Sequence, residues 1–400
     1  MVKLASIALA LMAAAGLAAQ QSPPAPSPAP SPQPAFRMPP PTPNDTLKSV
    51  EILADRHVTF RIYAPKASSV VLHPEGPEAT PGITPDELAK TYQGFPMTKD
   101  EQGVWTATIG PIAAGMYRYH FDVDGVFTAD PKTSLRSESL TNARSLYEVP
   151  GNEAIAIKPE IAHGAVASVT YYSKATTSLR RMHIYTPPGY AAGSARLPVL
   201  YLLHGGGDSD DSWWTVGRAG IILDNLIAAG KALPMIVVIP AGHISANFRL
   251  TPGFRMGHDA FNDDLVHVVL PYVDANYRTV ADRDHRAIAG LSMGGAQALN
   301  ISLESSDQFA WVGLFSTGWF GNTLDDEKKT TLANWRASGK PFTLYWVGVG
   351  QYDIALQNSR ATVAALNQAG IKTDARESGG FHAWNNWRDY LGEFAPLLFK

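Results

Sequence analysis

The sequence predicts an α/β protein: a parallel sheet covered by helices on both faces, preceded by a small all-β, immunoglobulin-like sandwich. In residues 46–150, short runs such as 58–62 alternate apolar and polar residues, which is typical of strands with one buried face. Residues 155–400 instead alternate continuous apolar runs with helix-like segments, as expected of strands buried on both faces. The expected strands include 198–203, 235–239 and 341–347, and the expected helices 217–229, 260–276, 360–370 and 387–399.

The first 45 residues carry export and spacer signals. Lys3 gives a positive start, and residues 4–17 form an apolar run of about the length of a signal-peptide core. We expect residues 1–20 to be a signal peptide and the protein to be secreted or periplasmic, an uncleaved membrane anchor being the alternative. Residues 21–45 are rich in proline and are expected to form a semi-rigid linker.

Charge and composition exclude several function classes. The formal net charge of −3 gives no electrostatic basis for binding nucleic acid or an anionic membrane. There is no cysteine, which excludes disulfides, thiolate catalysis and zinc–thiolate sites. The histidines, including His243, His258 and His267, lack the spacing of a metal site. We therefore expect no metal and no other cofactor.

A G-x-S-x-G motif centred on Ser292 is the strongest chemical signal. It follows a short apolar run, 286–289, and precedes a segment of small and apolar residues, 294–303, so the order strand, serine, helix is expected. A nucleophilic serine needs such a turn because its hydroxyl must stand clear of the backbone, and flanking small residues permit the turn. A chance match in a glycine-rich chain is the alternative, which the flanking pattern disfavours.

A serine nucleophile requires a base, and His382 is the only histidine downstream of Ser292. In α/β-hydrolases the chain order is serine, acid, histidine, so the base assignment is nearly forced. For the acid we favour Asp353, which follows an apolar strand and should lie at the reactive edge of the sheet. The competing carboxylates are Asp374, Asp325 and Asp326.

The oxyanion that forms during ester cleavage needs backbone N–H donors. One is expected from Met293, the residue after the nucleophile. The other is expected from the loop 204–208, whose sequence HGGGD follows the first buried strand, and we choose Gly206 within it. A phosphate-binding glycine loop is excluded because neither GK[ST] nor GxGxxG follows.

Four stretches of the second domain carry a family resemblance: LPVLYLLHGGGDSDDSWW, GLSMGGAQAL, VGVGQYD and HAWNNWRDYLGEFAPLLF. Together they resemble the esterase-D group, and more narrowly the family-one carbohydrate esterases, which are feruloyl and acetylxylan esterases. The resemblance covers nearly all of residues 165–400. It implies the triad Ser292, Asp353 and His382 with Met293 and Gly206 as donors. The polar stretch 321–340 is a possible departure that could reshape the acyl pocket.

The first domain resembles a carbohydrate-binding module. The stretches VTFRIYAPKASSVVL and GVWTATIGPIAAGMYRYHFDVDG are similar to the family-48 sandwich that precedes isoamylases and branching enzymes. Trp105, Tyr117 and Tyr119 could form a sugar platform. We favour a core role for the row that also contains Phe121 and Val123, because these residues share one face at period two.

The sequence thus predicts an exported serine esterase that removes feruloyl or acetyl groups from acylated plant polysaccharide (xylan) or from a feruloylated oligosaccharide. One alternative is an enterobactin-type siderophore esterase, which should have a pocket rich in Arg and Lys. The active-site stretches here contain aromatics (Trp213, Trp214, Trp384, Trp387) and acids (Asp208, Asp210, Asp211) instead. A second alternative is a non-catalytic glycan-binding protein. We expect the sandwich to bind the polymer rather than to contribute to catalysis. A chain that begins near residue 155 should therefore keep its activity on small esters.

Overall fold

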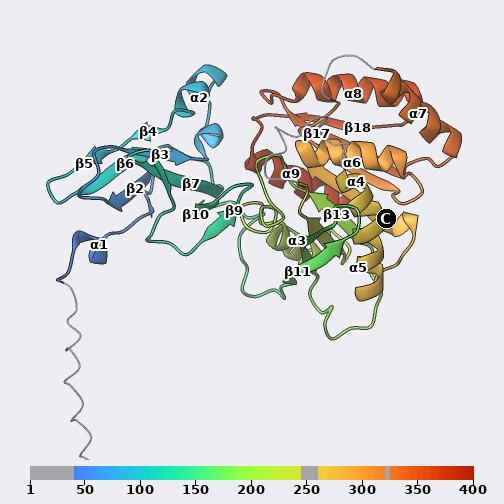
Figure 1. Cartoon of the computed structure of the whole chain (residues 1–400), viewed down its shortest axis with the longest axis horizontal. Helices are drawn as coiled ribbons and strands as arrows, with labels where there is room; N and C mark the ends of the chain where they lie inside the picture. The colour runs from blue at the N-terminus through green and yellow to red at the C-terminus, as the bar shows by residue number, and fades with distance from the viewer. Residues whose placement is uncertain (1–39, 245–259, 320–324) are drawn as a thin grey trace, which may run out of the picture. The chain divides into compact units, whose positions relative to one another are not determined.

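The computed structural model describes residues 40–244, 260–319 and 325–400 (Figure 1). The expected signal peptide and most of the expected linker lie outside these ranges, as does His258. Both predicted domains fall within one compact unit, Thr42–Lys400. Across the described ranges, no helix has the length and apolar character needed to cross a membrane.

The first domain is built from two antiparallel sheets. One has the strand order β1-β2-β6-β5 and comprises β1 (Glu51–Ile52), β2 (Val58–Tyr63), β6 (Val104–Ile109) and β5 (Thr98–Lys99). The other has the order β4-β3-β7-β10-β9, with β8 beside β7, and comprises β4 (Phe95–Pro96), β3 (Val70–Pro74), β7 (Gly115–Val123), β10 (Ala143–Val149), β9 (Arg136–Glu138) and β8 (Val126–Thr128). Two short helices, α1 (Pro43–Thr46) and α2 (Pro85–Thr91), belong to the same region. The predicted sandwich is confirmed.

The aromatic row on β7 lies in the core of this sandwich. Tyr117, Tyr119 and Phe121 are at most 1% exposed and belong to one hydrophobic cluster that draws residues from both sheets. Trp105 on β6 is 7% exposed and joins the same cluster. These side chains are therefore core residues, and the idea of a sugar platform made by Trp105, Tyr117 and Tyr119 is wrong.

The second domain contains an eight-stranded sheet with the order β11-β12-β14-β13-β15-β16-β17-β18. Its strands are β11 (Ala165–Ser173), β12 (Ser178–Thr186), β13 (Val199–Leu203), β14 (Ile236–Pro240), β15 (Arg286–Leu291), β16 (Trp311–Phe315), β17 (Leu344–Gly350) and β18 (Asp374–Ser378). The six strands from β14 to β18 pair in parallel, and β13 and β14 are buried along their whole length, as the apolar runs predict. The sequence does not predict the antiparallel hairpin β11–β12 at the edge.

Helices cover both faces of this sheet, as predicted. The two clusters of buried residues assign α3 (Ala219–Ala228) and α9 (Trp384–Phe394) to one face. They assign α4 (Ala260–Asp264), α5 (Leu270–Asn276), α6 (Met293–Glu304), α7 (Asp326–Ser338) and α8 (Leu356–Ala369) to the other. A π-helical segment, Leu265–Val269, joins α4 to α5. Helix α7 is not predicted and occupies most of the polar stretch 321–340, where it buries only Leu332 and Trp335.

A substitution at Phe121 tests whether the aromatic row on β7 belongs to the core. Phe121→Ala should lower the free energy of unfolding by about 3–5 kcal/mol, because it removes a fully buried ring and leaves a cavity. Val126→Ala on the neighbouring strand β8 is the control: this side chain is 63% exposed and its loss should cost less than about 0.5 kcal/mol. Chemical denaturation measures both, and equal small effects would contradict the core assignment.

Candidate active site

Ser292 lies in a sharp turn between β15 and α6. Its backbone has φ 51° and ψ −114°, a conformation that L-residues rarely adopt and that is typical of a nucleophile elbow. The surrounding backbone is correspondingly close: a Cβ added at Gly290 would lie 2.5 Å from the carbonyl oxygen of Gly294, and one added at Gly294 would lie 2.5 Å from that of His204. The small residues of the motif are therefore required by close backbone contacts on both sides of the serine.

The predicted donor Met293 is the first residue of α6. Hydrogen bonding within the helix begins with the N–H of Ala296, which donates to the carbonyl oxygen of Ser292 at 3.0 Å. The first-turn amides of a helix have no intrahelical acceptor and carry its positive dipole end. The N–H of Met293 is therefore available for a negative charge that develops beside Ser292.

His382 and Asp353 are brought together by two loops at one edge of the sheet. Asp353 follows β17, His382 precedes α9, and Nδ1 of His382 lies 2.8 Å from Oδ1 of Asp353. The Asp353 side chain is fully buried, while that of His382 is 22% exposed. Burial alone would raise the pKa of Asp353, but the hydrogen bond and charge of His382 hold it below its usual value. Asp353 thus remains a carboxylate that accepts from the imidazole.

The competing carboxylates lie elsewhere. Asp374 is on the edge strand β18, where its partly exposed carboxylate is 3.4 Å from Nε of Arg376. Asp325 caps α7 by accepting from the N–H of Lys328, and Asp326 is exposed in the first turn of that helix. Among the described residues, Asp353 is the carboxylate that contacts the His382 ring.

The glycine loop passes directly beside the serine. A Cβ added at Gly205 would lie 3.7 Å from Cβ of Ser292. Two hydrogen bonds of the His204 ring hold the loop. Its Nε2 accepts from the N–H of Gly242 at 2.8 Å. Its Nδ1 therefore carries the proton and donates to the carbonyl oxygen of Gly205 at 2.9 Å. Burial lowers the pKa of His204, which favours this neutral form.

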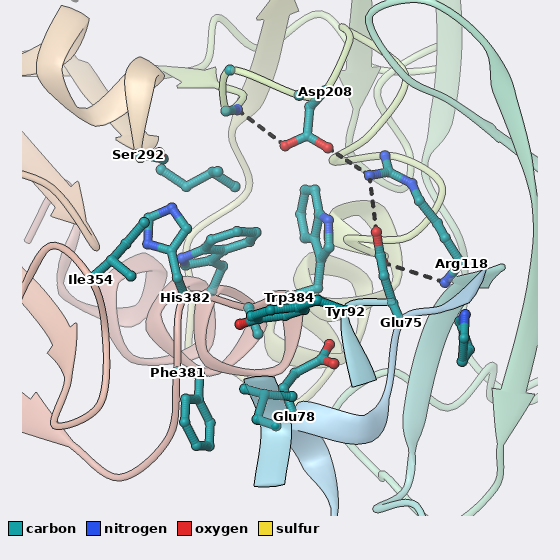
Figure 2. Close-up of a pocket in the computed structure, with 18 of the residues that line it drawn as sticks. Glu75, Glu78, Tyr92, Arg118, Asp208, Ser292, Ile354, Phe381, His382 and Trp384 are labelled. Carbon is teal, nitrogen blue, oxygen red and sulfur yellow. Dashed lines mark hydrogen bonds and ion pairs between the residues drawn. The ribbon is translucent and has the colours of Figure 1, made fainter. Parts of the chain in front are cut away.

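Ser292, His382 and Gly206 line one cavity of about 510 Å³ (Figure 2). Its walls come from both domains. The second domain supplies Trp384, Trp387, Phe381, Tyr352 and Ile354, together with the loop 205–208. The sandwich supplies His73, Glu75, Glu78, Tyr92, Arg118, His120 and Arg144, among others. Sequence reasoning missed these sandwich residues because no motif marks them.

The charges in the cavity are mostly paired with one another (Figure 2). Nη1 of Arg118 lies 2.6 Å from Oδ1 of Asp208 and 3.8 Å from Oε1 of Glu75, which is also 3.3 Å from Nη1 of Arg144. Burial, followed by the nearby charge of Glu75, raises the pKa of Glu78 to about 7. The lining therefore contains arginines that the second domain's own motifs do not predict, but each has a carboxylate partner.

The acids and aromatics singled out from the sequence have divided roles. Asp210 binds Arg181 and His183, and Asp211 accepts from the N–H of Glu138 at 2.8 Å, so both serve internal contacts. Trp213 is fully buried in the core.

Within the described ranges, no cluster of three or more His, Asp and Glu side chains is arranged to hold a metal ion.

Comparison with known proteins identifies the family of the second domain. Residues 173–396 match the esterase family model. The chain belongs to the esterase family. Residues 49–135 match the model of carbohydrate-binding module 48, the isoamylase N-terminal domain, so the sandwich belongs to that class of module.

Similar proteins include several feruloyl esterases. The chain is 33% identical over 355 residues to an endo-1,4-β-xylanase/feruloyl esterase from Xylanibacter ruminicola, covering 87% of this chain and 45% of the relative. A second relative, endo-1,4-β-xylanase Y of Acetivibrio thermocellus, is 24% identical over 298 residues, 68% of this chain and 26% of its own length. The chain thus spans less than half the length of either relative.

Solved structures agree on the fold. A CE1 ferulic acid esterase from the anaerobic fungus Anaeromyces mucronatus is 25% identical, with a TM-score of 0.55 over 62% of this chain and 96% of its own. An enterobactin esterase from Shigella flexneri has a TM-score of 0.60 over 88% of this chain and 95% of its own. At 18% identity the latter likeness concerns the fold alone.

The contact between Asp353 and His382 generates a mutational test of the acid. Asp353→Asn keeps the shape but removes the charge that orients and stabilises the imidazolium, so kcat on a soluble ester should fall on the order of 10⁴-fold with little change in folding. Asp374→Asn on the edge strand should leave kcat near that of the unmodified protein and change stability by less than about 0.5 kcal/mol. The reverse pattern would mean that the acid had been assigned to the wrong strand.

Proposed function

We propose that this chain is a serine carboxylic-ester hydrolase that removes feruloyl (hydroxycinnamoyl) or acetyl groups from xylan. The observation that carries the proposal is the elbow serine, which shares a cavity with a histidine held by a buried carboxylate and with a glycine loop. Nucleophile, base, orienting acid and oxyanion donors are the parts that acyl transfer requires. Membership of the esterase family supports the same reaction.

In the proposed reaction, Oγ of Ser292 attacks the ester carbonyl while Nε2 of His382 takes its proton. Asp353 accepts from Nδ1, which fixes the tautomer that leaves Nε2 free to act as a base. The imidazolium that forms is stabilised by the same buried carboxylate. It then gives the proton to the departing sugar alkoxide, and an acyl-enzyme remains on Ser292.

The tetrahedral intermediates carry a negative charge on the former carbonyl oxygen. The backbone N–H groups of Met293 and Gly206 are the proposed donors, and the N-terminal end of α6 adds a favourable dipole. A water molecule activated by His382 then attacks the acyl-enzyme and releases the free acid. No metal or other cofactor is needed for either half of this cycle.

Several observations support xylan as the polymer. The similar protein from Xylanibacter ruminicola carries the words xylanase and feruloyl esterase in its name, and the sandwich matches a carbohydrate-binding module. The cavity offers Trp384 and Trp387 as apolar surfaces for an aromatic acyl group or a sugar ring. Export to the periplasm or the medium, where xylan is met, is proposed from the pattern of residues 1–20.

The paired charges disfavour the siderophore alternative. An anionic trilactone calls for unneutralised cationic groups, whereas Arg118 and Arg144 both face Glu75 in the described part of the cavity. Glu78 and Asp208 add further acidic groups to the lining. The third alternative, a non-catalytic glycan-binding protein, does not account for a strained serine that shares a cavity with a histidine oriented by a buried carboxylate.

A substrate panel tests the proposed activity. The protein should hydrolyse methyl ferulate or acetylated xylan with a higher kcat/KM than enterobactin, measured at one pH and enzyme concentration. Ser292→Ala should fold normally and lose about six orders of magnitude in kcat on any substrate that is cleaved, because the triad acts as a unit. Enterobactin as the best substrate would replace the proposed function, and a tenth of the activity left in Ser292→Ala would remove the nucleophile.

Tyr92 offers a test of the sandwich's part in polymer recognition. Its side chain lines the cavity and is 74% exposed, so its ring is accessible to a bound polymer. Tyr92→Ala should lower kcat/KM on feruloylated xylan on the order of 10-fold through lost apolar contact, and by less on methyl ferulate. Tyr172→Ala is the matched control, a 57% exposed tyrosine on β11 outside the cavity lining. Equal rates on xylan for both variants would contradict this role.

A further inference from the structure

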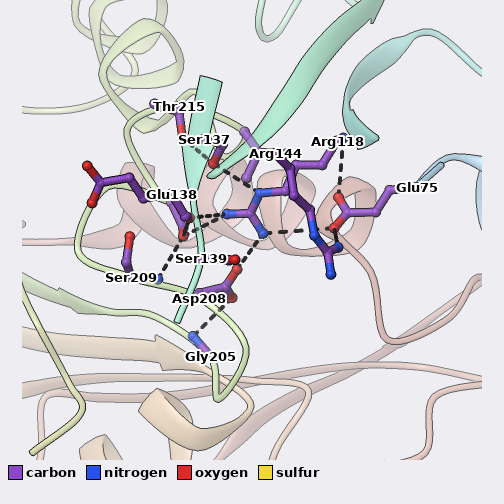
Figure 3. Close-up of polar contacts among 12 residues, drawn as sticks. Glu75, Arg118, Ser137, Glu138, Ser139, Arg144, Gly205, Asp208, Ser209 and Thr215 are labelled. Carbon is purple, nitrogen blue, oxygen red and sulfur yellow. Dashed lines mark hydrogen bonds and ion pairs between the residues drawn. The ribbon is translucent and has the colours of Figure 1, made fainter. Parts of the chain in front are cut away.

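Arg118 is a buried arginine of the sandwich that bonds both to its own domain and to residues 208–212 of the esterase domain. It lies on β7 and is 2% exposed. Nη1 donates to Oδ1 of Asp208 at 2.6 Å, and Nη2 donates to Oγ of Ser212 at 2.7 Å and to the carbonyl oxygen of Glu138 at 3.2 Å. Nε donates to Oγ of Ser137 at 2.9 Å (Figure 3). All three nitrogens of the guanidinium are therefore satisfied, which is what a buried cation requires.

Through Asp208, Arg118 reaches the backbone of the proposed oxyanion loop. The carboxylate uses Oδ1 for Arg118 and Oδ2 for the N–H of Gly205, at 3.3 Å (Figure 3). The sandwich also holds the loop by its backbone, because the N–H of Leu140 donates to the carbonyl oxygen of Gly207 at 3.2 Å. Gly206, the proposed donor, lies between these two attachment points.

The charge state of Asp208 supports this connection. Burial alone would raise the pKa of the Asp208 carboxyl, but the charge and hydrogen bond of Arg118 hold it below its usual value. The carboxylate is only 8% exposed, so no bulk solvent replaces Arg118 as its partner. Without Arg118, Asp208 would be driven to take a proton or to move toward water, and its hold on Gly205 would change.

We propose that Arg118 is a positioning residue for ester hydrolysis: it fixes the loop of Gly205 and Gly206 through Asp208, so that the sandwich completes the oxyanion site. The inference rests on the proposed function, because it concerns the same reaction. An oxyanion donor is worth about 10²–10³ in kcat, and a displacement of about 1 Å is enough to lose much of such an effect.

This inference reverses the expectation that the sandwich acts on the polymer alone. A second buried arginine strengthens the connection from the other side. Nη1 of Arg388, on helix α9, which follows His382 in the chain, donates to the carbonyl oxygens of Met116 at 2.9 Å and Val216 at 3.0 Å. Strand β7 is thus bonded to the oxyanion loop through Arg118 and, through Met116, to the helix that follows the His382 loop. A chain that begins near residue 155 would lack both attachments.

The test uses the full-length chain and a small soluble ester, so that polymer binding plays no part. Arg118→Gln, Arg118→Lys, Asp208→Asn and the double variant Arg118→Gln/Asp208→Asn are compared. Glu148→Gln is the control: it removes an ion pair of 2.7 Å between the sandwich and Arg218 but does not touch the loop. The measurements are kcat and KM per active site, thermal unfolding, and inhibition by an arylboronic acid, whose adduct with Ser292 places an oxygen in the oxyanion site.

Arg118→Gln and Asp208→Asn should each lower kcat about 10- to 100-fold while KM changes less than about threefold. Affinity for the boronic acid should fall by the same factor as kcat, which a merely structural role would not produce. The double variant should lose no more than the worse single variant, because both act through one contact. Arg118→Lys should be intermediate, since a single ammonium cannot keep all four contacts. Glu148→Gln should match the unmodified protein.

Several outcomes would overturn the inference. Unchanged kcat and boronic acid affinity in folded Asp208→Asn or Arg118→Lys would do so, as would a loss that the control variant shares. If Arg118→Gln does not fold, the other two single variants carry the test, because they keep the shape or the charge of the contact. If the unmodified protein cleaves no ester, the proposed function fails first, and this inference fails with it.

Discussion

The sharp turn at Ser292 is the constraint around which the rest of the site is arranged. The serine is held at a positive φ between a strand and a helix, and a Cβ added at Gly290 or Gly294 beside it would lie 2.5 Å from the carbonyl oxygen of Gly294 or His204, respectively. That closeness brings the glycine loop next to the serine, but it does not by itself hold the loop in place. His204 does so from the sheet side and Asp208 from the sandwich side. The geometry of one residue is therefore supported by contacts that extend into a second domain.

The sequence predicts those parts of the fold that periodicity determines. Strands β13 and β14 are recognisable because both their faces are buried and their residues are all apolar. The hairpin β11–β12 is missed because one of its strands lies at the sheet edge and mixes exposed with buried positions. Helix α7 is missed because it buries only Leu332 and Trp335 among charged residues, so its apolar stripe is too narrow to detect.

For the site, the local motif and the chain order were enough to propose Ser292, His382 and Asp353, because each of these signals is contained in a short stretch. Arg118 could not be predicted in this way. In the alternating pattern of β7 it falls on the face opposite Tyr117 and Tyr119, where an arginine is expected to face water. Arg118 is buried only because the second domain packs against that face. The periodicity of a strand gives no information about a partner 90 residues away, such as Asp208.

The distance of 90 residues between Arg118 and Asp208 also imposes an order on events as the chain is made. Synthesis proceeds from the N-terminus at roughly 5–20 residues per second, so the strand that bears Arg118 precedes its carboxylate by on the order of 5–20 s. During that interval the guanidinium has partners in its own domain, Ser137 and Glu138, but none from the second domain. The newly made sandwich therefore exposes to water the same surface that later holds the active-site loop, and the last step of its maturation must wait for residues 208–212.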